Sequence, residues 1–216
     1  MVDRNRRKLM LGISGLIAAG ASGAVAALAP TPRQTSGPFY PVTLPLDDDN
    51  NLTRVAGKSG TAKGIISELS GSIIDINGNP LHDMRIEIWQ CDANGRYRHP
   101  REKADRPLDE NFQGHGFTHT DARGLYRFRT IRPVSYPGRS PHIHIAVVPK
   151  DEAPFVTQLY IAGEPRNETD FLFNNIPPAK RHLVTAEFKP VSTDGAEQEA
   201  CFDIILNRTD GTPLAA

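Results

Sequence analysis

The 216-residue chain is predicted to be an all-β protein, an antiparallel β-sandwich with long loops and an extended N-terminal arm. Short segments in which apolar and polar residues alternate recur along the sequence, and clusters of Gly, Pro, Asn and Asp separate them. Beyond the N-terminal segment, no long stretch has the 3.6-residue periodicity of an amphipathic helix. The length suits one domain with a sizeable core. Together these features favour a sandwich over a helical bundle.

About eight segments carry the strand pattern, and two strong turn signals separate some of them. The turns are Asn-Gly-Asn-Pro at 77–80 and Asp-Ala-Arg-Gly at 121–124. The predicted strands cover residues 70–76, 84–90, 117–120, 125–130, 142–148, 156–161, 183–188 and 202–206. The polar stretch 100–115 is predicted to be a loop, and residues 171–181 are predicted to hold a short helical turn.

The chain divides into three predicted regions. Residues 1–29 are predicted to be an export signal, residues 30–63 an extended arm, and residues 64–216 the sandwich domain. The arm is predicted because its sequence is rich in Pro, Gly, Asp and Asn, which favour turns and irregular backbone over helices and strands.

The first region has the parts of an export signal: a basic stretch with the pair Arg6-Arg7, an apolar run, and a small-x-small cleavage site at Ala24-Val25-Ala26. Paired arginines before an apolar run resemble a twin-arginine signal, which exports folded proteins. We therefore expect a periplasmic or extracellular location. An uncleaved membrane anchor is the alternative.

Net charge limits the kinds of binding partner to expect, and the cysteine content limits the disulfide bonds. The chain has 25 basic and 25 acidic residues, so its net charge of zero gives no reason to expect nucleic acid, or a membrane beyond the export signal. Two cysteines, Cys91 and Cys201, are present. In an oxidising compartment they are equally compatible with a disulfide and with two reduced thiols. Neither has the surroundings of a nucleophile.

The most informative motif is His142-Ile143-His144, at the start of a β-branched run. On a strand, residues two apart point to the same face, so both imidazoles are expected to leave one side of the sheet. That spacing brings them close enough to share a metal ion. Two histidines alone are a weak motif, and a pair on a polar strand face is the alternative.

Two of the five tyrosines lie in turns rather than on predicted strands. Tyr97 follows the turn that ends at Gly95, and Tyr136 lies in a Pro-bracketed turn six residues before His142. Two phenolates with two imidazoles would suit ferric iron better than calcium, magnesium or zinc. Zinc remains the rival, because histidine pairs bind it well. Residue types alone leave the metal open.

Four ordered blocks of sequence resemble the intradiol ring-cleavage dioxygenases, in particular the protocatechuate 3,4-dioxygenase type. They are the arm segment Thr-Pro…Gly-Pro-Phe-Tyr-Pro at 31–41, Trp-Gln-Cys-Asp-Ala-Asn-Gly-Arg-Tyr at 89–97, the segment 120–133, and Tyr-Pro-x-Arg-x-x-His-x-His at 136–144. The segment 157–160 resembles the strand that follows the histidine motif in that family. The resemblance extends over about residues 31–206.

Carried over to this sequence, the resemblance implies an Fe(III) site made by Tyr97, Tyr136, His142 and His144. It implies that Tyr136 is displaced by a catecholic substrate and takes one of its protons. Arg139 and Gln158 would stabilise charge on the activated ring and orient it. The expected partners are a small catechol and O2, and the expected product is a cis,cis-muconate-type diacid. Residues 64–216 would then be the catalytic domain.

The sequence also departs from the family. Only five residues, Pro-Gly-Arg-Ser-Pro, separate Tyr136 from His142, with Gly138 where a bulky side chain would pack on the substrate. A more open pocket is expected, and neither the substrate nor the oligomeric state carries over, a homo-oligomer being one option. The alternative function is an exported, non-catalytic β-sandwich that binds an aromatic or carbohydrate ligand. A zinc hydrolase is a third hypothesis, weakened by the lack of a well-placed carboxylate.

The remaining candidate side chains are assigned to packing or to the surface. Tyr126 and Tyr160 fall in the middle of predicted strands and are expected to pack. The other histidines lack a paired spacing and are expected to lie at the surface or in polar networks; they are His82, His99, His115, His119 and His182.

Overall fold

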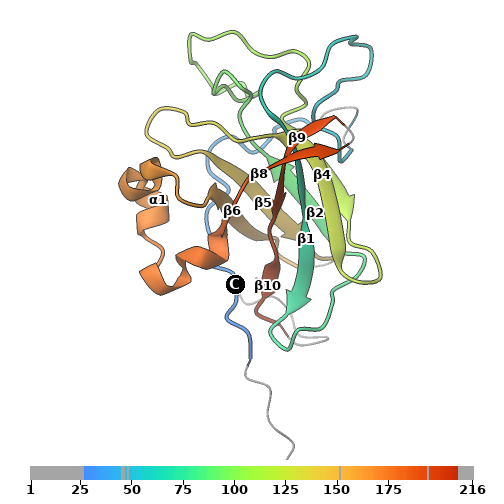
Figure 1. Ribbon diagram of the computed structural model, residues 1–216, viewed down its shortest axis with the longest axis vertical. Coiled ribbons are helices and arrows are strands. Elements are labelled where there is room, and N and C mark those ends of the chain that lie inside the picture. Colours follow the sequence, from blue (N-terminus) through green and yellow to red (C-terminus); the bar gives the residue numbers. More distant parts are fainter. Residues whose placement is uncertain (1–26, 45–46, 48, 151, 194, 209–216) are drawn as a thin grey trace, which may run out of the picture.

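The structure is a computed structural model that describes residues 27–44, 47, 49–150, 152–193 and 195–208. Two five-stranded sheets pack face to face as a sandwich, which confirms the predicted all-β class (Figure 1). Of the predicted export signal, residues 1–26 lie outside the described residues. Within the described part of the chain, the helices are too short and too polar to span a membrane.

The first sheet has the strand order β10-β1-β9-β8, with β4 also pairing with β1. Its strands are β1 (Ile66–Asp75), β4 (Leu125–Ile131), β8 (Lys189–Thr193), β9 (Ala196–Cys201) and β10 (Ile204–Leu206).

The second sheet has the strand order β3-β2-β5-β6-β7. Its strands are β2 (Arg85–Trp89), β3 (His115–His119), β5 (His142–Val148), β6 (Phe155–Ile161) and β7 (Thr185–Ala186). Three short helical segments connect β6 to β7: η1 (Pro165–Thr169), α1 (Phe171–Asn174) and η2 (Pro178–Val184). They lie beside β6 at one side of the sandwich (Figure 1).

The predicted antiparallel sandwich is confirmed as an all-β sandwich, but its two sheets are mixed and also contain parallel strand pairs. β1 runs parallel to β9 and β10, and β6 runs parallel to β7. Parallel neighbours need a long crossover between them. The helical segments supply one crossover between β6 and β7, and the whole second sheet lies between β1 and its two parallel partners in the chain.

Most predicted strands are present, but the C-terminal part differs. The predicted strand 183–188 is reduced to β7, because a 3-10 segment that begins at Pro178 runs through Val184. β8 and β9 are absent from the prediction. β9 buries only the small side chains of Ala196 and Ala200 and exposes glutamates between them, so its apolar alternation is weak.

β5 is buried on both of its faces, and the two faces differ in chemistry. Ile143, Ile145 and Val147 point into the apolar core between the sheets. His142 and His144, on the opposite face, are each 1% exposed. The period-two alternation therefore separates the core of the sandwich from a polar layer on the outside of the second sheet.

The N-terminal arm crosses from one sheet to the other. The backbone N–H of Thr31 donates to the carbonyl of Ile205 on β10, and the N–H of Gln34 donates to the carbonyl of Val156 on β6. Residues 27–44 form neither helix nor strand. These contacts place the arm against the outer face of the second sheet, next to the two histidines.

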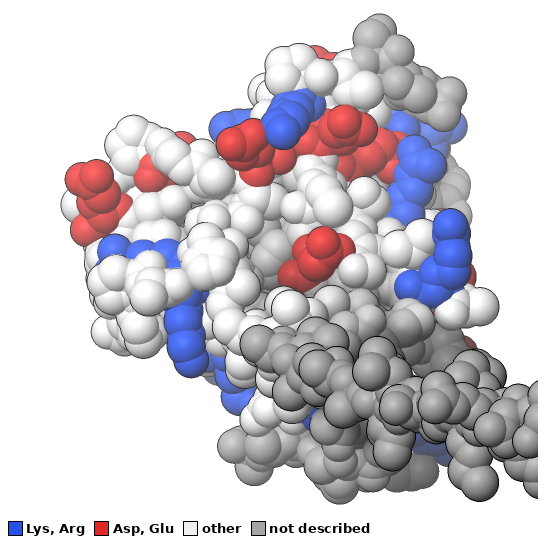
Figure 2. All heavy atoms as spheres, turned by 60° about the horizontal axis from the view of Figure 1, so that its bottom comes forward, with Lys and Arg blue, Asp and Glu red and all other residues white. Residues whose placement is uncertain are grey.

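Surface charge and the two cysteines can also be compared with what the sequence predicts. On the face drawn in Figure 2, acidic and basic side chains lie next to one another, in keeping with a net charge of zero. Cys91 is buried and Cys201 is exposed, and both are free, so this structure contains no disulfide between them.

Candidate metal centre

His142 and His144 project from the same face of β5, as the sequence predicts. In the strand register, Trp89 on β2 pairs with His144, which in turn pairs with Gln158 on β6. His142 pairs with Tyr160. Because directly paired residues point to the same side of a sheet, three strands bring these side chains to one small area. The Nε2 atoms of the two imidazoles are 3.3 Å apart.

The two imidazole rings are held in different ways. His142 Nδ1 lies 2.6 Å from the carbonyl oxygen of Ser140, which makes Nδ1 the donor and leaves the Nε2 lone pair free. The ring of His144 stacks on Trp89, with centroids 4.8 Å apart and planes 6° apart. Its Nδ1 is buried and makes no hydrogen bond. A Cβ on Gly37 would lie 3.3 Å from His144 Cε1, so the glycine lets the arm close against the ring.

Both imidazoles are neutral at ordinary pH. Burial and the neighbouring Arg139 lower the pKa of His142 to about 4. Burial, followed by His142 and Arg139, lowers the pKa of His144 well below its usual value. Neutral imidazoles keep the lone pair that a metal ligand needs.

Tight turns position the two tyrosines. The Asp92 carboxylate accepts hydrogen bonds from two backbone N–H groups of the turn that leads into Tyr97. Tyr136 opens a turn closed by a 3.0 Å hydrogen bond from the N–H of Arg139 to the Tyr136 carbonyl. Gly138 has a φ of 79° in this turn, a conformation that favours glycine. Both turns therefore depend on local sequence.

The tyrosines reach the histidines from outside the sheet. The Tyr97 and Tyr136 ring centroids are 5.4 Å apart. The Tyr136 centroid is 5.5 Å from that of His142, and the Tyr97 centroid is 6.3 Å from that of His144. The structure thus brings together all four residues that the resemblance implies as metal ligands.

The donor set fits a highly charged cation. Burial raises the pKa of Tyr97 well above its usual value, and its buried hydroxyl makes no hydrogen bond. Burial also raises the pKa of Tyr136, against the opposing effect of Arg139. The charge of a nearby metal ion would favour the ionised form of such phenols. Among the described residues, no group of three or more His, Cys, Asp or Glu side chains forms a conventional zinc or calcium site.

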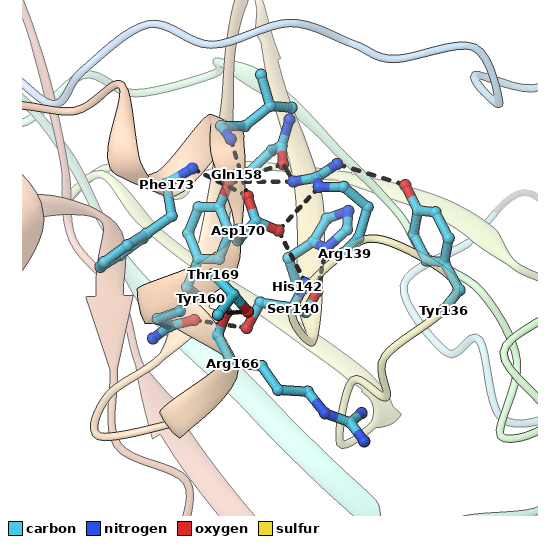
Figure 3. Close-up of polar contacts among 12 residues, drawn as sticks. Tyr136, Arg139, Ser140, His142, Gln158, Tyr160, Arg166, Thr169, Asp170 and Phe173 are labelled. Carbon is cyan, nitrogen blue, oxygen red and sulfur yellow. Dashed lines mark hydrogen bonds and ion pairs between the residues drawn. The ribbon is translucent and has the colours of Figure 1, made fainter.

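Arg139 organises the polar layer behind the ligands (Figure 3). Its Nη2 donates to Gln158 Oε1 at 2.6 Å and to the Tyr160 hydroxyl at 3.2 Å. Nε forms a 2.8 Å ion pair with Asp170, and Nη1 lies 3.4 Å from the Tyr136 hydroxyl. Arg139 and Gln158 therefore belong to a buried polar layer beside the candidate centre, and neither is a solvated residue.

An open pocket of about 610 Å³ lies beside the centre. Tyr136, Gly138 and Arg139 line it. A Cβ added to Gly138 would meet no atom within 4 Å, so no side chain closes the pocket at this point.

Comparisons with known proteins decide the family. A family model described as "Dioxygenase" matches residues 35–208. The protocatechuate 3,4-dioxygenase beta chain of Burkholderia cepacia is 38% identical over 179 residues, which are 79% of this chain and 75% of that protein. The chain belongs to the intradiol ring-cleavage dioxygenases. The hydroxyquinol 1,2-dioxygenase of Corynebacterium glutamicum is 33% identical over 61% of this chain, and the match spans 46% of that protein.

Solved structures of intradiol dioxygenases share the fold. The dioxygenase domain of a dioxygenase and carbohydrate-binding fusion protein from Streptomyces sp. SirexAA-E superimposes with a TM-score of 0.65 at 29% identity, covering 84% of this chain and all of that one. An intradiol ring-cleavage dioxygenase from Tetranychus urticae gives a TM-score of 0.67 at 20% identity, covering 83% and 95% of the two chains. The second of these likenesses shows the fold alone.

Asp170 also contributes to the polar layer of the candidate site, and the sequence does not single it out. Asp170 is 1% exposed and pairs with Arg139. It also accepts hydrogen bonds from the N–H of Ser140 at 2.8 Å and, as the N-cap of α1, from Leu172 and Phe173. An Asp before a predicted helical turn is a capping signal, and that signal alone could have drawn attention to it.

Tyr160 packs in the interior as expected, and its hydroxyl also makes hydrogen bonds. It is completely buried against Phe173, but its hydroxyl also lies 3.0 Å from the side-chain oxygens of Gln34 and Gln158. The Gln158 amide in turn donates to the Thr35 carbonyl at 3.0 Å. The arm is therefore built into the site of this dioxygenase.

The other histidines and Tyr126 lie outside the cluster of Tyr97, Tyr136, His142 and His144. Tyr126 is buried in the core. His99 and His115 are buried, and His115 Nε2 is 3.5 Å from Glu87 in a polar cluster on the outer face of β2. His82, His119 and His182 are exposed.

Proposed function

We propose that this chain is an exported, non-haem Fe(III) dioxygenase that inserts O2 into a catecholic aromatic and cleaves the ring between the hydroxylated carbons. The product would be a cis,cis-muconate-type diacid. One observation carries the proposal: Tyr97, Tyr136, His142 and His144 converge, although they come from two turns and one strand. A non-catalytic sandwich that binds a ligand has no need for two phenols beside two neutral imidazoles.

Fe(III) is the cation that this donor set suits best, since phenolate oxygens favour hard, highly charged ions. Tyr97, Tyr136, His142 and His144 would hold it. The chemistry that such an ion would supply is Lewis-acid activation of the catecholic ring towards O2.

The two tyrosines differ in a way that assigns their roles. Tyr97 is 3% exposed and stacks against Phe39, with ring centroids 4.8 Å apart, so it is fixed in the interior. Tyr136 is partly exposed and lines the open pocket. Tyr136 is therefore the ligand that can swing towards the pocket, and its hydroxyl oxygen would accept a proton from the incoming catechol.

Arg139 and Gln158 act on the bound ring. Arg139 remains a cation under all ordinary conditions, and its guanidinium is fixed by Asp170 and Gln158 before any substrate arrives. A preorganised cation in a partly dry site stabilises negative charge that develops in the transition state. Gln158 is completely buried and holds the guanidinium in its orientation.

The location and the partners of the chain remain parts of this proposal. The twin-arginine-like sequence at Arg6-Arg7 supports export to the periplasm or beyond. The proposed partners are a small catechol and O2, with a homo-oligomer as one possible assembly. The chain spans 75% of its protocatechuate relative but only 46% of the hydroxyquinol enzyme, so the activity of neither transfers automatically.

The visible absorption spectrum of the purified protein tests the function directly. We expect a broad band from tyrosinate-to-iron charge transfer, and a shift of this band to longer wavelength when a catechol is added without O2. Full occupancy by a different metal in a colourless protein would contradict the proposal.

Replacement of Tyr136 by Phe tests its role as base. The variant should keep iron and colour through Tyr97, with an altered band, and its kcat should fall about 100-fold or more, the scale of a lost acid–base group. Steady-state kinetics together with iron analysis would measure this. Unchanged kcat would show that Tyr136 is not the proton acceptor.

A further inference from the structure

Gln34, on the N-terminal arm, reaches into the polar layer beside the candidate metal centre. Its side-chain nitrogen donates to the Thr157 hydroxyl at 3.2 Å and to the Gln158 carbonyl at 3.1 Å, both on β6. The Thr157 hydroxyl donates its own proton to the Pro32 carbonyl at 2.8 Å, so it accepts from Gln34. These contacts fix the orientation of the Gln34 amide, and its oxygen faces the Tyr160 hydroxyl at 3.0 Å.

The hydroxyl of Tyr160 has one proton and two acceptors within reach. Gln34 Oε1 and Gln158 Oε1 both lie 3.0 Å from the hydroxyl oxygen. Gln158 Oε1 also accepts from Arg139 Nη2 at 2.6 Å, and a cationic donor makes this hydrogen bond the stronger one. When Tyr160 donates to Gln34, Gln158 Oε1 is left for Arg139.

The Tyr160 oxygen then adds to the support of the Arg139 guanidinium (Figure 3). Arg139 Nη2 donates to this oxygen at 3.2 Å as well as to Gln158. Tyr160 and Gln158 are completely buried, so water does not replace a lost partner. Without the Gln34 amide, the Tyr160 proton would turn to Gln158 Oε1 and compete with Arg139 for it. The orientation of Arg139 therefore depends on a residue of the arm that lies two hydrogen bonds away.

We propose that Gln34 is a positioning residue for ring cleavage, which acts through Tyr160 and Gln158 on the orientation of Arg139. This inference rests on the proposed function, because Arg139 acts on a bound ring only if the chain is the dioxygenase described above. It gives the arm a part in the reaction in addition to its packing against the second sheet.

The first test measures how firmly Arg139 is held, in the full chain without metal. Gln34→Met keeps the length of the side chain and removes its polar atoms. In an NMR spectrum, the side-chain N–H signals of Arg139 are assigned by their absence in Arg139→Lys. These protons should exchange with water about two- to tenfold faster in Gln34→Met, the factor that corresponds to the loss of one hydrogen bond.

The second test follows turnover by the iron-loaded protein, with catechol and 3,4-dihydroxybenzoate as probes. In Gln34→Met, kcat should fall about ten- to a hundredfold, since misplacement of a positioned group by about 1 Å can cost a factor of about 100. KM and iron content should stay unchanged, because Gln34 lies outside the cluster of four candidate ligands. A general loss of structure would instead lower iron content and kcat together.

A double-mutant cycle tests the route through Tyr160. Tyr160→Phe removes the hydroxyl that links Gln34 to Arg139, so the double variant should be no slower than the slower of the two single variants. If the two losses in kcat multiply, the residues act independently and the proposal is overturned.

Arg33→Gln is the matched control, on the neighbouring residue of the arm. Arg33 is exposed, and its Nη1 donates to the Pro154 carbonyl at 2.7 Å, so this variant loosens the arm at a contact outside the Tyr160 network. Its kcat and its Arg139 exchange rate should match those of the natural protein. Equal losses in Arg33→Gln and Gln34→Met would mean that any loosening of the arm slows the reaction, and would overturn the specific role of Gln34.

The outcomes keep this inference apart from the proposed function. A natural kcat or a natural Arg139 exchange rate in Gln34→Met would overturn the positioning role while the dioxygenase function stands. If neither probe shifts the visible band of the natural protein or is turned over, the proposed function fails and this inference fails with it.

Discussion

The two faces of β5 come from the same seven residues but differ in how specific their contacts are. On the inner face, Ile143, Ile145 and Val147 join one continuous apolar core that any shape-compatible side chains could fill. On the outer face, His142 and His144 have specific neighbours from the arm, from two turns and from β2. The comparison shows that strand alternation suffices to place the histidines, whereas the rest of the chain must supply the chemistry.

The sharpest contrast is between two adjacent residues, His144 and Ile145. His144→Ala should abolish iron binding, while Ile145→Ala should lower the free energy of unfolding by about 2–5 kcal/mol, because it opens a cavity in the core. Iron content per chain and urea unfolding of the metal-free proteins measure the two effects.

A milder core variant serves as a control in case Ile145→Ala does not fold. Ile145→Val should cost about 0.5–1.5 kcal/mol and keep full iron content. Full iron retention in His144→Ala would mean that the outer face is not the metal centre.

The next effect concerns the ion pair that supports the outer face. Asp170→Asn keeps a residue able to cap α1 but removes the charge opposite Arg139. Since the Asp170 and Arg139 side chains are only 0% and 8% exposed, we expect a loss of about 3 kcal/mol in the free energy of unfolding. Glu187→Gln, in an exposed pair with Lys189, is the control and should change little.

The effect of Asp170→Asn on the free energy of unfolding should also depend on pH. Burial alone would raise the pKa of Asp170, but hydrogen bonds from Phe173, Ser140 and Arg139 outweigh it and lower the pKa below its usual value. A lowered folded-state pKa contributes stability above about pH 4 that disappears as the pH falls through the folded value. The stability difference between the natural protein and Asp170→Asn should therefore shrink below pH 4. A difference that stays constant down to pH 2 would contradict this.

The smallest expected effect belongs to Trp89, which supports His144 only by stacking. Trp89→Leu should weaken iron binding up to about tenfold, since an aromatic stack contributes about 0.5–1.5 kcal/mol. Trp89→Phe keeps an aromatic face and should stay within about twofold. Iron affinity by competition with a chelator, with the visible band as a second signal, measures both; equal losses in the two variants would argue against stacking.

The sequence predicted the inner face and part of the outer one. The His142–His144 alternation follows from the geometry of a strand, and Tyr97 and Tyr136 came from the resemblance to a family. Asp170 could not be placed, because its partner Arg139 is 31 residues away and the contact depends on the crossover between β6 and β7. β9 went unrecognised because its buried side chains, Ala196 and Ala200, are too small to stand out from a loop.

Under the proposed function, the arm makes completion of the metal site depend on the synthesis of β10. Gln34 and Thr35 complete the polar layer of the site, and the arm that carries them is anchored by Thr31 to Ile205, 174 residues further on. Contacts between such distant residues form late in folding. A nascent chain still on the ribosome therefore lacks a finished site until β10 has emerged, and we expect iron to enter only after that point.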